Sequence, residues 1–169
     1  MILHSSKPSL SWPSRVIGRK TLRLTTPTTL KAIRKIMKSV FADTFYFLAL
    51  LNERDAAHER ALIASRVPGL RLARTGFVLI ELADALCKPY QRDEVLTLYQ
   101  VVETDSAFHF VRASAELIQQ GWKIYRERPD KEWPLTDCIS FVVMHEFELT
   151  QALTADRHFE QAGFRALLS

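Results

Sequence analysis

Hydrophobic residues recur along most of the chain with two alternating periods, one typical of strands and the other typical of helices. Short apolar runs bounded by turn residues alternate with longer segments in which apolar residues recur every three or four positions. Strands separated by helices predict a mostly parallel sheet in a three-layer α/β/α domain, with ligands beyond the carboxyl ends of the strands. The pattern predicts strands at 39–42, 70–73, 108–111, 150–154 and 164–168, and helices at 44–51, 55–65, 76–87, 92–103, 114–127 and 135–145.

The N-terminal segment, residues 1–36, lacks this periodicity. It is rich in Ser, Thr and Pro and contains the breaker run 25–29. We therefore expect a basic, disordered leader over 1–36 and a folded domain over 37–169. The leader is interpreted as an over-extended gene start before Met37, and the alternatives are a basic arm that contacts RNA and an organellar transit peptide.

Charge is distributed unevenly between these two parts. The whole chain has a net charge of +4, from 23 basic and 19 acidic residues. Residues 1–36 contain eight basic residues and no acidic one, which leaves 15 basic and 19 acidic residues, a net charge of −4, for 37–169. The folded part therefore cannot attract a polyanion through its overall charge, and a local basic patch or a bound metal must do so.

The two cysteines, Cys87 and Cys138, each lie within an apolar helical pattern, and neither belongs to a CxxC motif. We expect both to be buried and reduced, which excludes a disulfide framework and a zinc site. No apolar run reaches the roughly 18 residues that a membrane-spanning helix needs, and the chain does not open with a secretory signal. The expected location is the cytoplasm.

Four acidic residues occupy positions that suggest a common site. Asp43 and Asp156 each follow an apolar strand, so both should lie at the same edge of a parallel sheet. Glu81 and Asp137 each interrupt an apolar helical surface and have no Lys or Arg three or four residues away. Four carboxylates at one edge would repel one another unless a divalent cation lay between them, and all-oxygen ligands favour Mg²⁺ or Mn²⁺. Such ions activate water for attack on a phosphodiester.

Each acid also has a simpler explanation when taken alone. Asp43 or Asp156 could be no more than an N-cap residue of the following helix. Glu81 could be a partly exposed helical residue, and Asp137 could be a carboxylate favoured by the helix dipole. The agreement of all four favours one metal site.

Two other enzyme classes are excluded by single positions. His145-Glu146 lacks the second histidine of a zinc protease, because position 149 is Leu149. A phosphatase of the haloacid-dehalogenase type needs Asp-x-Asp, and position 45 is Phe45.

The four acids and their surroundings resemble the acidic motifs of PIN-domain ribonucleases. The resemblance covers 37–169 and rests on Asp43-Thr44, on Glu81 and on the segments 135–141 and 153–164. It is closest to the toxin component of VapBC-like toxin–antitoxin modules. The resemblance implies a PIN-like fold and a Mg²⁺- or Mn²⁺-dependent endoribonuclease that leaves 5′-phosphate and 3′-hydroxyl ends. It also implies a homodimer that is inhibited by a cognate antitoxin. The alternative function is that of a catalytically silent PIN module with an RNA-binding or regulatory role.

By the same resemblance, Asp43, Glu81, Asp137 and Asp156 are the catalytic, metal-binding acids, and Thr154 orients them by hydrogen bonding. Asp84 replaces an Asn that is common in the family, and is interpreted either as an outer carboxylate or as a solvated residue.

Two further features have open interpretations. His158 either contacts a substrate phosphate or is an ordinary surface or capping histidine. The segment 122–133 interleaves Trp, Tyr, Lys and Arg and is interpreted either as an RNA-contacting surface or as a core aromatic stripe beside a solvated basic face.

Overall fold

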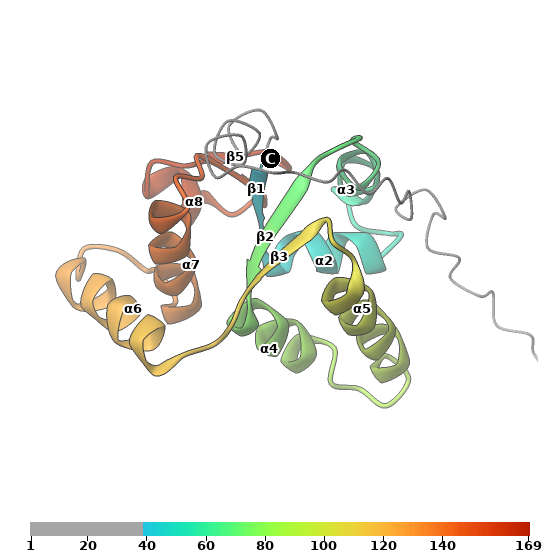
Figure 1. The fold of residues 1–169 in the computed structure, drawn as a ribbon, viewed down its shortest axis with the longest axis horizontal. Helices are drawn as coiled ribbons and strands as arrows, with labels where there is room; N and C mark the ends of the chain where they lie inside the picture. Colours follow the sequence, from blue (N-terminus) through green and yellow to red (C-terminus); the bar gives the residue numbers. More distant parts are fainter. Residues whose placement is uncertain (1–38) are drawn as a thin grey trace, which may run out of the picture.

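A sheet of five parallel strands forms the centre of the computed structural model, which describes residues 39–169 (Figure 1). The strand order is β3-β2-β1-β4-β5, so β1 is the central strand. The leader predicted at 1–36, together with Met37, lies outside the described residues. The strands are β1 (Ser39–Ala42), β2 (Arg71–Thr75), β3 (Phe108–Val111), β4 (Gln151–Leu153) and β5 (Arg165–Ala166).

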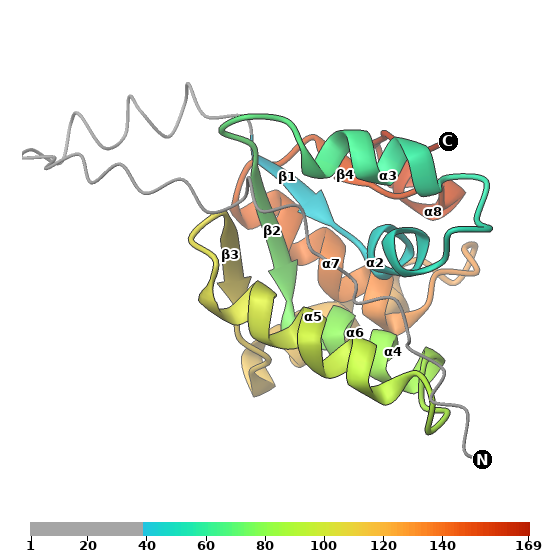
Figure 2. The same cartoon turned by 90° about the vertical axis from the view of Figure 1, so that its right-hand side faces the viewer.

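Helices cover both faces of this sheet, which confirms the predicted three-layer α/β/α fold. In Figure 1, α2, α3 and α5 lie on one side of the strands, and α6, α7 and α8 lie on the other. Figure 2 looks onto the first of these faces, with α7 behind the strands. The helices are α2 (Thr44–Leu51), α3 (His58–Ser65), α4 (Gly76–Ala85), α5 (Arg92–Thr104), α6 (Ala115–Glu127), α7 (Leu135–Glu146) and α8 (Arg157–Gln161).

The register of the central strands determines which residues leave the sheet together. Phe41 and Ala42 of β1 pair with Ala152 and Leu153 of β4, although these strands are more than 100 residues apart in sequence. Asp43 and Thr154 therefore follow neighbouring strands at the same edge.

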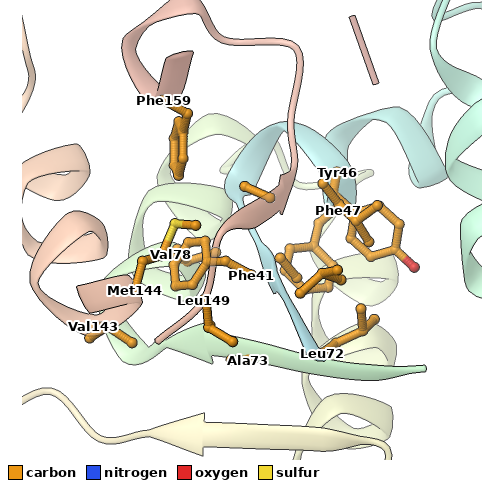
Figure 3. Close-up of a cluster of buried hydrophobic side chains, with 14 of the residues drawn as sticks. Phe41, Tyr46, Phe47, Leu72, Ala73, Val78, Val143, Met144, Leu149 and Phe159 are labelled. Carbon is orange, nitrogen blue, oxygen red and sulfur yellow. The ribbon is translucent and has the colours of Figure 1, made fainter. Parts of the chain in front are cut away.

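The hydrophobic core holds β1 between the two helical layers. Phe41 is fully buried and packs against Phe159, with ring centroids 6.1 Å apart, while Tyr46 and Phe47 lie on the other side of β1 (Figure 3). Burial of each large side chain contributes roughly 1.5–3 kcal/mol, so the central strand is firmly held at the point where Asp43 emerges.

Several predicted boundaries differ from the structure. The helix predicted at 55–65 begins at His58, because Asp55 forms a local turn in which its Oδ1 accepts a hydrogen bond from the Ala57 N–H, at 2.8 Å. The helix predicted at 76–87 ends at Ala85, which leaves Cys87 exposed, so the predicted burial of this thiol is wrong. Cys138 is buried and free, as predicted. The second strand extends to residue 75, and the last two strands are shorter than predicted.

Helix α8 is an element that the sequence pattern did not predict. It begins at the N-cap Asp156 and ends in a Schellman motif, in which the N–H groups of Gly163 and Phe164 bond back to the carbonyls of Glu160 and Phe159. Gly163 has a φ of 91°, which side chains with a Cβ rarely adopt. Over residues 39–169, every helix is too short or too polar to cross a membrane.

Candidate metal centre

Asp43 lies at the carboxyl end of the central strand, and only 6% of its surface is exposed. Its Oδ2 accepts a hydrogen bond of 2.8 Å from Oγ1 of Thr154, a buried residue that follows β4. Although Asp43 occupies the N-cap position of α2, its side chain forms no capping hydrogen bond. Helix capping therefore does not account for this buried carboxylate.

Thr154 also connects this position to Asp156. Its Oγ1 accepts a hydrogen bond of 3.0 Å from the Asp156 N–H. The side chain of Asp156 is 37% exposed, and its Oδ1 accepts the N–H of His158 at 2.8 Å. Asp156 therefore does cap its helix, but with one oxygen only.

Glu81 reaches the same edge from α4. It is half-buried, and its Oε2 accepts a hydrogen bond of 2.5 Å from Oγ1 of Thr44, the buried first residue of α2. The sequence pattern identifies Thr44 only as the neighbour of Asp43 in the first acidic motif. Its hydroxyl, directly after the strand-end acid, is the feature that could have marked Thr44 as a hydrogen-bond donor of the site.

Asp137 lies in the first turn of α7 and is buried. Its Oδ2 lies 2.9 Å from Nδ1 of His158, and the same Nδ1 lies 3.3 Å from Oδ1 of Asp156. Potential ligand atoms of these three residues all lie within 4.8 Å of one another.

The charges of neighbouring acids act on the two most buried carboxylates, those of Asp43 and Asp137. Burial raises the pKa of Asp43 to about 7, and repulsion from Asp137 and Glu81 adds to this effect, while the hydrogen bond from Thr154 opposes it. Burial also raises the pKa of Asp137, and the charges of Asp156 and Glu81 act in the same direction. The ionised cluster is therefore costly in the protein alone.

The chemistry of these four acids fits a divalent cation, and among the described residues the ligand atoms within 4.8 Å of one another include those of Asp137 and Asp156 but not those of Asp43 or Glu81. Among the described residues, no Lys or Arg forms an ion pair with any of the four acids. Carboxylate oxygens are the ligands that Mg²⁺ and Mn²⁺ prefer, and a cation between the carboxylates would relieve their repulsion.

The remaining candidates from the sequence are Asp84 and the segment 122–133. Asp84 is exposed and, over residues 39–169, forms none of the hydrogen bonds of the site. Trp133 is buried, and its Nε1 donates to Gln161, whereas Trp122 and Tyr125 are about half exposed and form an edge-to-face pair. The segment 122–133 thus contains both a core aromatic residue and an exposed aromatic pair.

Comparison with known proteins gives a family match and several similar solved structures, among them VapC20 and VapBC2. The family model of the PIN domain matches residues 40–165. VapC20 of Mycobacterium tuberculosis, described as a toxin that cleaves the sarcin–ricin loop, has 26% sequence identity and a TM-score of 0.65, over 74% of this chain and 95% of that one. VapBC2 of Rickettsia felis, bound to a DNA fragment of its promoter, shares the fold at 12% identity and a TM-score of 0.54, over 76% of this chain and 96% of that one. No curated protein gives a significant match to the sequence.

Proposed function

The chain belongs to the PIN-domain family, and from this premise we propose that it is a metal-dependent endoribonuclease, the toxin of a toxin–antitoxin pair. We assign Asp43, Glu81, Asp137 and Asp156 as the residues that hold Mg²⁺ or Mn²⁺. The observation that carries the proposal is the burial of Asp43 among other carboxylates without a basic partner in the described part of the chain.

The residues of the site would divide the work between binding and orientation. The four carboxylates hold the cation, and Thr154 and Thr44 fix Asp43 and Glu81 by hydrogen bonds. A bound divalent cation supplies an activated water and neutralises charge on the phosphodiester. By the family resemblance, water would attack the phosphorus and expel the 3′ oxygen, which leaves 5′-phosphate and 3′-hydroxyl ends.

The similar structures support proposals for the RNA substrate and the protein partners. VapC20 is described as cleaving the sarcin–ricin loop, so a hairpin RNA with this loop is the first substrate to test. We also propose a cognate antitoxin, by analogy with the VapBC2 complex, and a homodimer. Size-exclusion chromatography with light scattering, performed with and without the product of a neighbouring reading frame, tests both assemblies.

The catalytic test compares the wild-type chain with Asp43→Asn. Wild type should cleave the hairpin with Mg²⁺ or Mn²⁺, lose this activity in a chelator and recover it in excess metal. Asp43→Asn should fold but cleave at least about 100-fold more slowly, because it removes a ligand charge at the reacting centre. Cleavage that persists in chelator and leaves cyclic phosphate ends would contradict the proposal.

A thermal melt measures metal binding separately from cleavage, and so addresses the alternative of a catalytically silent PIN module. Mn²⁺ should raise the melting temperature of wild type far more than that of Asp43→Asn, because a ligand that binds only the folded state stabilises it by about 2.7 kcal/mol at 100 times its Kd. Stabilisation by Mn²⁺ without cleavage of any RNA would indicate the silent module.

A further inference from the structure

Each of the four acids has one carboxylate oxygen held by a donor from the protein. The other oxygen of each carboxylate is then the one available to a cation. The four hydrogen bonds run from Thr154 Oγ1 to Asp43 Oδ2, from Thr44 Oγ1 to Glu81 Oε2, from His158 Nδ1 to Asp137 Oδ2 and from the His158 N–H to Asp156 Oδ1.

His158 differs from the two threonines because it contacts the carboxylates of two of the acids. Its ring contacts Asp137 at 2.9 Å, and its main-chain N–H donates to Asp156 at 2.8 Å. An ionised carboxylate only accepts hydrogen bonds, so the ring proton lies on Nδ1. A protonated Nδ1 donates to a carboxylate and cannot bind a metal at the same time.

The ring of His158 is held in place by its neighbours in the fold. Its side chain is only 15% exposed. The next residue, Phe159, is fully buried and packs against both Phe41 and Phe141. The packing of Phe159 therefore anchors the main chain at His158 beside the acidic site.

We propose that His158 is a positioning residue that turns Oδ1 of Asp137 and Oδ2 of Asp156 toward the cation, an inference that rests on the proposed function. Donors that orient metal-binding carboxylates raise metal affinity, and their loss typically costs roughly 10- to 100-fold. The opposing arrangement is one in which a ring nitrogen of His158 is itself a metal ligand, since one of its ring nitrogens lies within 4.8 Å of ligand atoms of both acids.

The test measures Mn²⁺ affinity by titration calorimetry on the full chain, independently of RNA cleavage. His158→Ala should weaken binding by roughly 10- to 100-fold. His158→Asn places an amide N–H near the position of Nδ1 and should recover most of the affinity, whereas His158→Gln, whose amide reaches toward the position of Nε2, should recover less. His109→Ala, at an exposed histidine of the edge strand β3, is the matched control and should bind as wild type does.

Pulsed electron paramagnetic resonance of bound Mn²⁺ distinguishes the two arrangements. A positioning role predicts no nitrogen directly coordinated to Mn²⁺ in wild type. A directly coordinated nitrogen that disappears in His158→Ala would overturn the inference, as would an unchanged affinity in a folded His158→Ala. If wild type itself binds no Mn²⁺, the proposed function fails, and this inference fails with it.

Discussion

At the scale of single residues, the buried, ionised carboxylate of Asp43 lowers the stability of the folded protein, and other interactions of the fold must compensate for this. Its Oδ2 has one hydrogen bond, from Thr154, and its surroundings include two other acids rather than a cation from a basic side chain. A group of this kind persists where function requires it, because an Asn of the same shape would avoid the cost.

Replacing Asp43 by Asn should therefore stabilise the metal-free protein in a pH-dependent way. The pKa of Asp43 is about 7 in the folded chain and 3.8 without the fold. The Asp43 carboxyl thus binds more protons in the folded state between these pH values, so its contribution to the stability of wild type falls as pH rises from 4 through 7. In chelator at pH 8, Asp43→Asn should be more stable by on the order of 2–4 kcal/mol.

Urea unfolding at several pH values measures this effect. The difference between Asp43→Asn and wild type should shrink as pH falls and stop changing below about pH 3, where Asp43 is protonated in both the folded and the unfolded state. A difference that is constant with pH would show that Asp43 is not the group responsible.

Arg74 is a second buried charge, and it lies away from the acidic site. It is fully buried on β2, and its guanidinium lies 4.4 Å from the ring centre of Phe110. Its Nη2 atom donates a hydrogen bond to the carbonyl of Val102, in the last turn of α5. Its Nε and Nη1 atoms have no hydrogen-bond partner among the described residues. Burial lowers its pKa to about 10.

Arg74→Met should therefore be close to wild type in stability or more stable, because an apolar side chain of similar length fills the space without a buried charge. Arg74→Ala should lose about 3 kcal/mol, since it leaves a cavity. Chemical unfolding of both variants at pH 7 checks the contrast. An equal loss of stability in Arg74→Met and Arg74→Ala would show that the charge of Arg74 itself stabilises the contact with the last turn of α5.

At the scale of secondary structure, helix α8 carries Asp156 and His158 into the acidic site. Its five residues depend on two end signals, the cap by Asp156 and the Schellman motif at Gly163. So short a helix has little intrinsic stability, and these ends together with Phe159 hold it in place.

Gly163→Ala tests this dependence, with Gly69→Ala as the matched control. Both glycines have positive φ, 91° and 73°, and neither has an atom within 4 Å of the position of an added Cβ. Each substitution should cost about 1 kcal/mol of stability through backbone strain. Only Gly163→Ala should also weaken Mn²⁺ binding, measured by calorimetry, because Gly69 lies in the turn before β2. Equal Mn²⁺ affinities in the two variants would show that α8 does not depend on this turn.

The sequence predicted those features that depend on local periodicity. Asp43 and Asp156 could be assigned to one edge because parallel strands end together, and the family match confirms the resemblance drawn from the four acidic motifs. The direction of Glu81 and Asp137 depends on how α4 and α7 pack, and periodicity shows only that each interrupts an apolar surface. Helix α8 was missed because five residues are too few to show a helical period.

At the scale of the whole molecule, the most basic segment of the sequence and the proposed catalytic acids lie in different parts of the chain. The eight basic residues of 1–36 contrast with a net charge of −4 over 37–169. RNA would therefore approach an acidic domain, where local contacts and bound metal must offset repulsion.

Deleting residues 1–36 should leave folding and RNA cleavage essentially unchanged at physiological salt. The truncation removes no residue of β1 and none of the proposed metal ligands. At low salt, the full chain should bind RNA more tightly than the truncated one, because basic side chains release counterions from RNA, and this difference should shrink as salt rises. Circular dichroism and cleavage rates at two salt concentrations measure these effects. Loss of folding, or of most cleavage at physiological salt, would make the leader a working part of the enzyme.

The pairing of β1 with β4 also determines when the protein can become active during its synthesis. Asp43 receives its hydrogen bond from Thr154, 111 residues later, and the last two site residues lie within about ten residues of the C-terminal strand. Residues 43–158 must therefore all have left the ribosome before the acidic site can assemble. Incomplete translation products would lack the site, and a nuclease of this topology cannot cut RNA while most of it is still being made.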